Sequence, residues 1–162
     1  MKLDLEDISL GEYETVVTAK NRLVIPQPLR TGLNLNAVDL YLQLEPAGFV
    51  SGYTARQYQS LLVEIQGISS LHQDSQEFSR AIFSQTQIFT LDEQGRITLP
   101  EAFLTHLKIT EKSTVIALGV GIKFELWNKD LWQAKKSRFT NIRESLQERV
   151  AFLIDNRRRP SN

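Results

Sequence analysis

The chain has 162 residues, of which 41% are apolar, so it is long enough to bury a core and too apolar for a disordered or collagen-like polymer. It has no cysteine, which excludes disulfides, thiolate metal sites and cysteine nucleophiles. Its 19 Lys and Arg residues balance 19 Asp and Glu residues, so any affinity for nucleic acid has to come from the positions of the charges rather than from their sum.

The pattern from the N-terminus predicts a strand over residues 12–17, a polar turn containing Lys20 and Asn21, and a second strand over Leu23–Ile25. That strand stops at Pro26, because a proline can open a helix but cannot sit in the middle of a sheet. A short helix is therefore expected next. Two more apolar strands follow, over residues 40–44 and 49–52, with a turn between them.

Residues 54–84 are mostly polar, with apolar positions at helical spacing, and this predicts one or two helices. The first series of elements then begins again. A strand over residues 86–91 enters a turn containing Gln94 and Gly95, and the next strand stops at Pro100. Two further strands, 114–118 and 123–127, precede a helical pattern from residue 128 to about residue 154.

The two series are copies of one unit, related by an offset of 74 residues, the separation of Arg22 from Arg96. The offset aligns TAKNRLVIPQPLRTGLNL, beginning at Thr18, with DEQGRITLPEAFLTHLKI, beginning at Asp92. It continues without a gap and places Tyr53 on Trp127. An internal repeat of this kind indicates a duplicated architecture.

The repeated turn carries the candidate chemistry, because an arginine occupies the same place in both copies. The guanidinium of Arg22 or Arg96 can bind a phosphate or the edge of guanine with two hydrogen bonds, and a two-stranded ribbon fits the major groove of DNA. The alternative is structural: each arginine pairs with a carboxylate such as Asp92 at the turn. The repeat does not decide between these interpretations.

The aromatic residues Tyr53, Tyr58, Trp127 and Trp132 recur at strand ends and helix starts. This regular placement favours packing of each hairpin on its helix over a role in base stacking.

LDEQGRITLP (Leu91–Pro100), followed by KFELWNKDLW (Lys123–Trp132), resembles the second half of MraZ proteins. LGEY (Leu10–Tyr13) and KNRLVIPQPLR (Lys20–Arg30) resemble the first half. The second motif is intact, with Asp92, Gly95 and Arg96 in the expected places. In the first motif Thr18 stands where the family has Asp and Asn21 where it has Gly. Asn tolerates a positive φ better than most residues, so a tight turn is still expected there.

The resemblance implies an AbrB-like fold in which two swapped-hairpin half-units interlock, giving a mixed α+β, β-rich pseudo-barrel with peripheral helices. We divide the chain into a first repeat (10–66), a helical connector (67–84), a second repeat (85–139), and a C-terminal helix with a basic tail (140–162).

The resemblance also implies a DNA-binding transcriptional regulator that assembles into a ring-like homo-oligomer and binds repeated sites in double-stranded promoter DNA. It would control its own operon in the division and cell-wall gene cluster. We expect the protein to be cytoplasmic and nucleoid-associated, with no membrane span, no cofactor, no metal site and no small-molecule substrate. The expected DNA-binding residues are Lys20, Asn21, Arg22, Arg30, Gln94 and Arg96, with Lys20 and Arg22 as the primary contacts.

Two other classes of function compete with this one. The first is an AbrB-class antitoxin-like or protein-interaction module that binds DNA weakly, which would suit the zero net charge and the altered first motif. The duplication and the predicted C-terminal helices oppose it. The second is an enzyme, against which stands the absence of a Ser/His/Asp order, a phosphate-binding loop or a metal-ligand cluster in the sequence.

Overall fold

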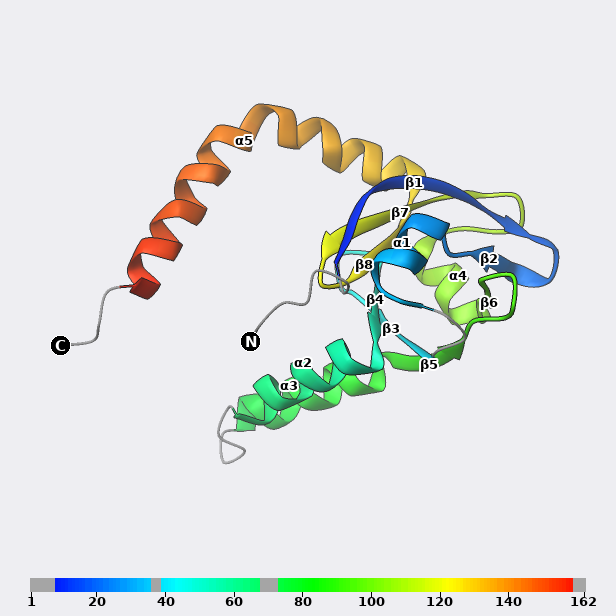
Figure 1. Cartoon of the computed structure of the whole chain (residues 1–162), viewed down its shortest axis with the longest axis horizontal. Helices are drawn as coiled ribbons and strands as arrows, with labels where there is room; N and C mark the ends of the chain where they lie inside the picture. The colour runs from blue at the N-terminus through cyan, green and yellow to red at the C-terminus, as the bar shows by residue number, and fades with distance from the viewer. Residues whose placement is uncertain (1–7, 36–38, 68–72, 159–162) are drawn as a thin grey trace. The chain divides into compact units, whose positions relative to one another are not determined.

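The computed structural model describes residues 8–35, 39–67 and 73–158, and Figure 1 shows its elements. In chain order they are β1 (Ser9–Thr18), the 3-10 turn η2 (Ala19–Asn21), β2 (Arg22–Val24), α1 (Gln27–Gly32), β3 (Asp39–Leu44), β4 (Val50–Thr54), α2 (Ala55–Gly67), α3 (Gln73–Ser84), β5 (Thr86–Thr90), β6 (Arg96–Thr98), α4 (Glu101–Leu107), β7 (Thr114–Gly121), β8 (Phe124–Asn128) and α5 (Lys129–Arg158). The chain forms two compact units, Met1–Lys129 and Asp130–Asn162.

The two short helices begin where the sequence predicts. Pro26 and Pro100 stand immediately before α1 and α4, in extended conformation, and end strands β2 and β6. A proline ends a strand because it has no N–H for the ladder, and its fixed φ suits the start of a helix. In both repeats a proline at the equivalent position therefore marks the change from strand to short helix.

The eight strands form one antiparallel sheet in the order β5-β3-β4-β8-β7-β1-β2-β6. The strands are exchanged between the repeats: β1 pairs along its length with β7 of the second repeat, and β5 of the second repeat pairs with β3 of the first. The two end strands, β5 and β6, follow each other in the chain, and the N–H of Asp92 donates to the carbonyl of Arg96 (3.0 Å) in the turn between them. The sheet therefore curls into a nearly closed barrel.

An approximate two-fold axis relates the repeats. Leu23 lies opposite Ile97 in the β2–β6 pair, and Ser51 lies opposite Glu125 in the β4–β8 pair. In both pairs the two residues are 74 positions apart, the offset of the sequence repeat. Each pair is therefore a residue facing its own equivalent, as a two-fold axis between the repeats requires.

The core lies inside the barrel and draws on both repeats. Its largest fully buried side chains include Leu23, Ile25, Ile97, Leu99, Phe103 and Phe124. Tyr53, Tyr58 and Trp127 are also buried, which confirms that these three aromatic residues pack rather than project. The predicted fold class, a β-rich α+β pseudo-barrel of two swapped half-units with peripheral helices, is confirmed.

The predicted helices between and after the repeats are present as α2, α3 and α5. Within the described ranges, none of the helices combines the length and apolar composition that crossing a membrane requires. The four-part division at residues 66, 84 and 139 stays a prediction, and strands from both repeats share one sheet.

Candidate nucleic-acid interface

The ribbon of β2 and β6 presents both repeat arginines on its outward face. Arg22 lies opposite Thr98, and Arg96 lies opposite Val24. Residues opposite each other share a face of a sheet, as do residues two apart on one strand. Leu23 and Ile97, between them, point into the core and are 0% and 1% exposed. Arg22 and Arg96 are therefore diagonal neighbours on the side of the ribbon that faces away from the core.

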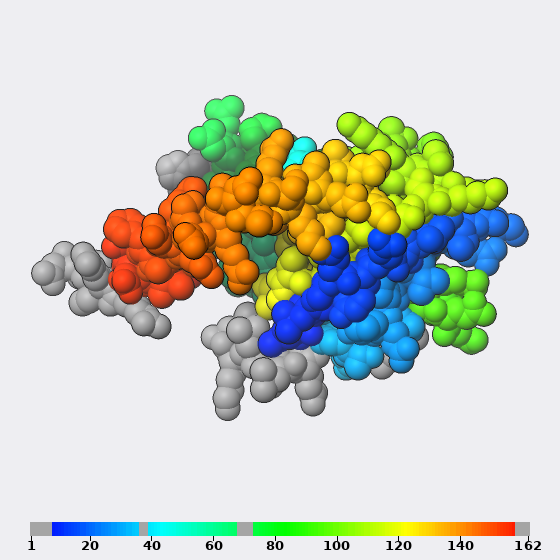
Figure 2. Space-filling model, turned by 90° about the horizontal axis from the view of Figure 1, so that it is seen from above, coloured from blue at the N-terminus to red at the C-terminus, as the bar shows by residue number. Residues whose placement is uncertain are grey.

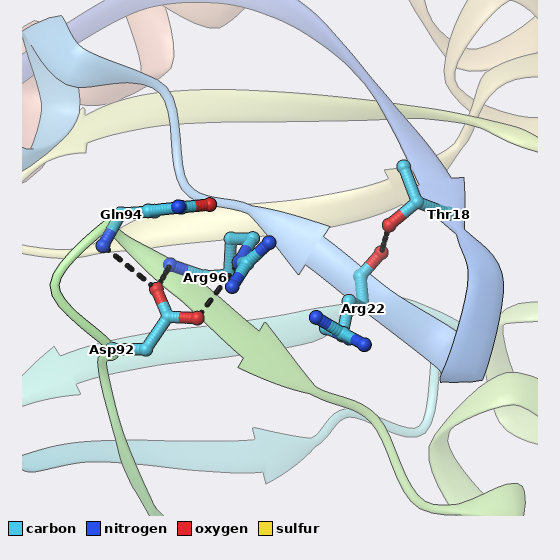
Figure 3. A network of polar contacts seen from close by, with 5 residues as sticks. All are labelled: Thr18, Arg22, Asp92, Gln94 and Arg96. Carbon is cyan, nitrogen blue, oxygen red and sulfur yellow. Dashed lines mark hydrogen bonds and ion pairs between the residues drawn. The ribbon is translucent and has the colours of Figure 1, made fainter.

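The turn from Asp92 to Arg96, the second turn, is held by its own carboxylate (Figure 3). Asp92 Oδ1 accepts from the backbone N–H groups of Gln94 and Arg96, each at 2.9 Å. Its Oδ2 accepts from the Nε–H of Arg96 at 2.7 Å. The backbone N–H and the side chain of Arg96 are the main causes that hold the pKa of Asp92 below its usual range. Asp92 therefore holds Arg96 through its Nε–H, and this bond does not use the two terminal nitrogens of the guanidinium.

Arg30 supports this second turn from the first repeat. Its Nε–H donates to the carbonyl of Ile25 at 2.9 Å. Gly95 has a φ of +72°, and a Cβ added there would lie 2.5 Å from Arg30 Cζ. The glycine therefore allows both the left-handed backbone and the close approach of the guanidinium.

The turn from Thr18 to Arg22, the first turn, has a different construction. Lys20 and Asn21 are both left-handed, with φ of +62° and +56°, so the positive φ expected for Asn21 is confirmed and extends to Lys20. Thr18 has no carboxylate, and its hydroxyl donates to the carbonyl of Arg22 at 3.1 Å. The backbone N–H of Lys20 donates to Glu111 Oε1 at 2.8 Å, across to the loop after α4.

The six predicted site residues fall into two groups. Lys20, Asn21 and Arg22 lie on the first turn, whereas Gln94 and Arg96 lie on the second turn with Arg30 packed against it. Lys20 and Gln94 are exposed. Within the described part of the chain, the Arg22 guanidinium has no carboxylate within ion-pair distance, in contrast to Arg96. The structural interpretation, an arginine paired with a carboxylate such as Asp92, therefore holds for Arg96, and among the described residues it does not hold for Arg22.

Glu111 is the residue of this site that the sequence analysis missed. The one sequence feature that bears on it is the absence of Asp at position 18, which leaves the first turn without a carboxylate of its own at that position. Strand pairing explains how Glu111 reaches the first turn. β1 pairs with β7, which places the loop before β7 beside the first turn. Val17 and this loop also exchange two backbone hydrogen bonds, from Val17 N–H to Ser113 O (3.0 Å) and from Lys112 N–H to Val17 O (2.7 Å).

The arrangement suits recognition of a polyanion with hydrogen-bond acceptors. Two guanidinium groups on one face of the β2–β6 strand pair can each form a forked pair with a phosphate or with guanine O6 and N7. Lys20 and Gln94 flank them at equivalent positions of the two turns. No group of His, Asp and Glu side chains with the geometry of a metal site occurs in the ranges that the structure describes.

Comparison with known proteins points to one family. The family model "MraZ protein", described as antitoxin-like, matches residues 82–156. A transcriptional regulator MraZ from Ligilactobacillus salivarius (strain UCC118) is 30% identical over 141 residues, which cover 85% of this chain and 95% of that protein. The solution structure of PHS018 from Pyrococcus horikoshii aligns with 70% of this chain and 91% of its own at 15% identity, with a TM-score of 0.35. A TM-score this low carries no weight for fold or function.

Proposed function

Because this chain belongs to the MraZ family of transcriptional regulators, we propose that it regulates transcription by binding promoter DNA through the β2–β6 ribbon and the two turns beside it. Arg22 and Lys20 of the first turn are the primary contacts, and Gln94 and Arg96 of the second turn contact the same groove. Asn21 and Arg30 hold or flank these groups. The protein acts as a binding protein and not as an enzyme.

The observation that carries this proposal is the common face of Arg22 and Arg96 on an antiparallel ribbon. Such a ribbon fits the major groove, where forked arginine contacts distinguish guanine from the other bases. The approximate two-fold axis passes between Leu23 and Ile97, at the centre of this ribbon. We therefore propose that the two arginines contact the two sides of one groove.

The zero net charge of the chain implies that one protomer binds weakly. We therefore propose that several protomers, as a ring-like homo-oligomer, present ribbons to repeated sites in the promoter, so that avidity supplies the affinity. The regulated operon is the chain's own, in the division and cell-wall gene cluster, which places the protein in the cytoplasm at the nucleoid. Light scattering should then give a mass above that of a dimer, and a monomer that binds tightly would contradict the avidity argument.

The direct test is fluorescence anisotropy with the DNA upstream of the chain's own gene, beside unrelated DNA of equal length at the same salt. We expect tighter binding to the upstream DNA, and log K should fall with log salt at about −0.9 per neutralised phosphate. Equal affinity for both DNAs, or an affinity that stays flat from about 50 to about 200 mM salt, would favour the protein-binding alternative.

A further inference from the structure

The two turns receive a carboxylate at the same backbone position but from different places in the chain. In the second turn, Asp92 Oδ1 accepts from the N–H of Gln94 at 2.9 Å. In the first turn, Glu111 Oε1 accepts from the N–H of Lys20 at 2.8 Å. Gln94 and Lys20 are equivalent at the repeat offset of 74, so the same N–H group is bound in both turns.

The amino-acid types at the equivalent positions show the same exchange of carboxylates between the repeats. The position equivalent to Asp92 is Thr18, which has no carboxylate, and the position equivalent to Glu111 is Ala37, which has none either. In each turn one carboxylate therefore binds this N–H group, and it comes from the turn itself in the second repeat and from the loop after α4 in the first. Ala37 lies outside the described residues, and its role in the comparison is that of its amino-acid type alone.

We infer that Glu111 is a positioning residue that replaces, from the other repeat, the Asp that the first turn lacks at position 18. It fixes the N–H of Lys20 while Lys20 and Asn21 adopt left-handed backbone conformations, which non-glycine residues adopt at a cost. The loop that carries Glu111 lies directly against the first turn, as the yellow-green and blue surfaces of Figure 2 show. Because Glu111 bonds the backbone and not the Arg22 side chain, it shapes the turn without occupying the guanidinium.

This inference rests on the proposed DNA-binding function for its consequence, but not for its test. Three variants of the full chain separate the hydrogen bond from the charge. Glu111→Gln and Glu111→Ala lose the same negative charge, and only Glu111→Ala also loses the acceptor. The double variant Glu111→Ala with Thr18→Asp has the net charge of the parent and places the acceptor where the second turn has it.

The first measurement is amide hydrogen exchange of Lys20 by nuclear magnetic resonance, which needs no DNA. We expect Lys20 N–H to exchange about 2- to 10-fold faster in Glu111→Ala, the range for loss of one hydrogen bond. The rates in Glu111→Gln and in the double variant should stay near that of the parent. An unchanged rate in Glu111→Ala, or no recovery in the double variant, overturns the inference whether or not the protein binds DNA.

The second measurement is affinity for the upstream DNA at constant salt. Removal of a carboxylate beside Lys20 should by itself favour binding to phosphates, so Glu111→Gln should bind as tightly as the parent or more tightly. Glu111→Ala should bind about 2- to 10-fold more weakly than Glu111→Gln, and the double variant should recover. Glu111→Ala and Glu111→Gln binding alike would show that Glu111 acts through charge only and would overturn the positioning role. If the parent itself does not bind this DNA, the proposed function fails, and the exchange measurement still decides the inference.

Discussion

Leu23 lies directly opposite Ile97 in the β2–β6 ribbon, and the two residues hold the same position in the two repeats. Both point into the core and are at most 1% exposed. The ribbon that carries the candidate DNA contacts is therefore anchored from behind by one residue of each repeat. Its position depends on the packing of both halves.

Truncating either residue of this pair should be strongly destabilising. We expect Leu23→Ala and Ile97→Ala each to lower the free energy of unfolding by about 2–5 kcal/mol, because each leaves a cavity in a fully packed core. Val63, which is 69% exposed on α2, provides a control: Val63→Ala should change stability by less than about 0.5 kcal/mol. Urea unfolding measures all three, and a small effect of Leu23→Ala would mean that the ribbon does not seal the core.

Gly95→Ala should destabilise the second turn. The added Cβ would lie 2.5 Å from the Arg30 guanidinium. The alanine would also have to adopt a φ of +72°, which costs an L-residue about 1–2 kcal/mol. Gly67→Ala, on α2, is the matched control because a Cβ there meets nothing within 4 Å. Thermal unfolding should show a lower midpoint for Gly95→Ala and no loss for Gly67→Ala. Equal midpoints would show that the turn relaxes without cost.

The Asp92 network should give the second turn a dependence on pH. Hydrogen bonds from the backbone N–H and then the side chain of Arg96 lower the pKa of Asp92 in the folded chain. A carboxyl group with a lowered folded pKa contributes stability above its unfolded pKa, about 3.9, and loses that contribution as the pH falls through the folded value. Parent and Asp92→Asn should therefore differ in melting temperature near neutral pH, with the parent higher, and converge in acid. A difference that does not change with pH would assign the effect to shape instead of charge.

The sequence predicts the duplicated unit, both prolines that end strands, and the left-handed Asn21, because each depends on local residue types. Local residue types do not predict which strands pair, and the interlocking of the two half-units is expected only from the resemblance to MraZ proteins. The repeat offset states that β1 and β5 are equivalent, but both β1–β7 and β3–β5 pairings cross between repeats, and no local signal chooses crossing over pairing within a repeat.

The sequence does not identify Glu111 for the same reason. Glu111 lies 91 residues from Lys20 in the chain, and only the β1–β7 pairing brings them together. Arg30 is similar: the sequence identifies a basic residue after Pro26, whereas its packing against Gly95 of the other repeat depends on the tertiary fold. The side chains that support the turns are therefore less predictable than the side chains on them.

The two repeat arginines should contribute unequally to DNA affinity. Arg96 bonds Asp92 through Nε at 2.7 Å, so part of its charge is already balanced, whereas Arg22 has no such carboxylate among the described residues. Loss of a forked contact to a base costs about 1–3 kcal/mol, or about 5- to 150-fold in affinity. Arg22→Ala should reach this range, and Arg96→Ala should weaken binding less.

The control is Arg80→Ala, which removes the same charge from α3, where Arg80 pairs with Glu77 and is 65% exposed. This variant should bind like the parent. Anisotropy with the upstream DNA measures all three, with circular dichroism to establish that each variant is folded. If Arg22→Ala binds like the parent while Arg96→Ala does not, the intact second turn makes the contact and the assignment of Arg22 as the primary residue is wrong.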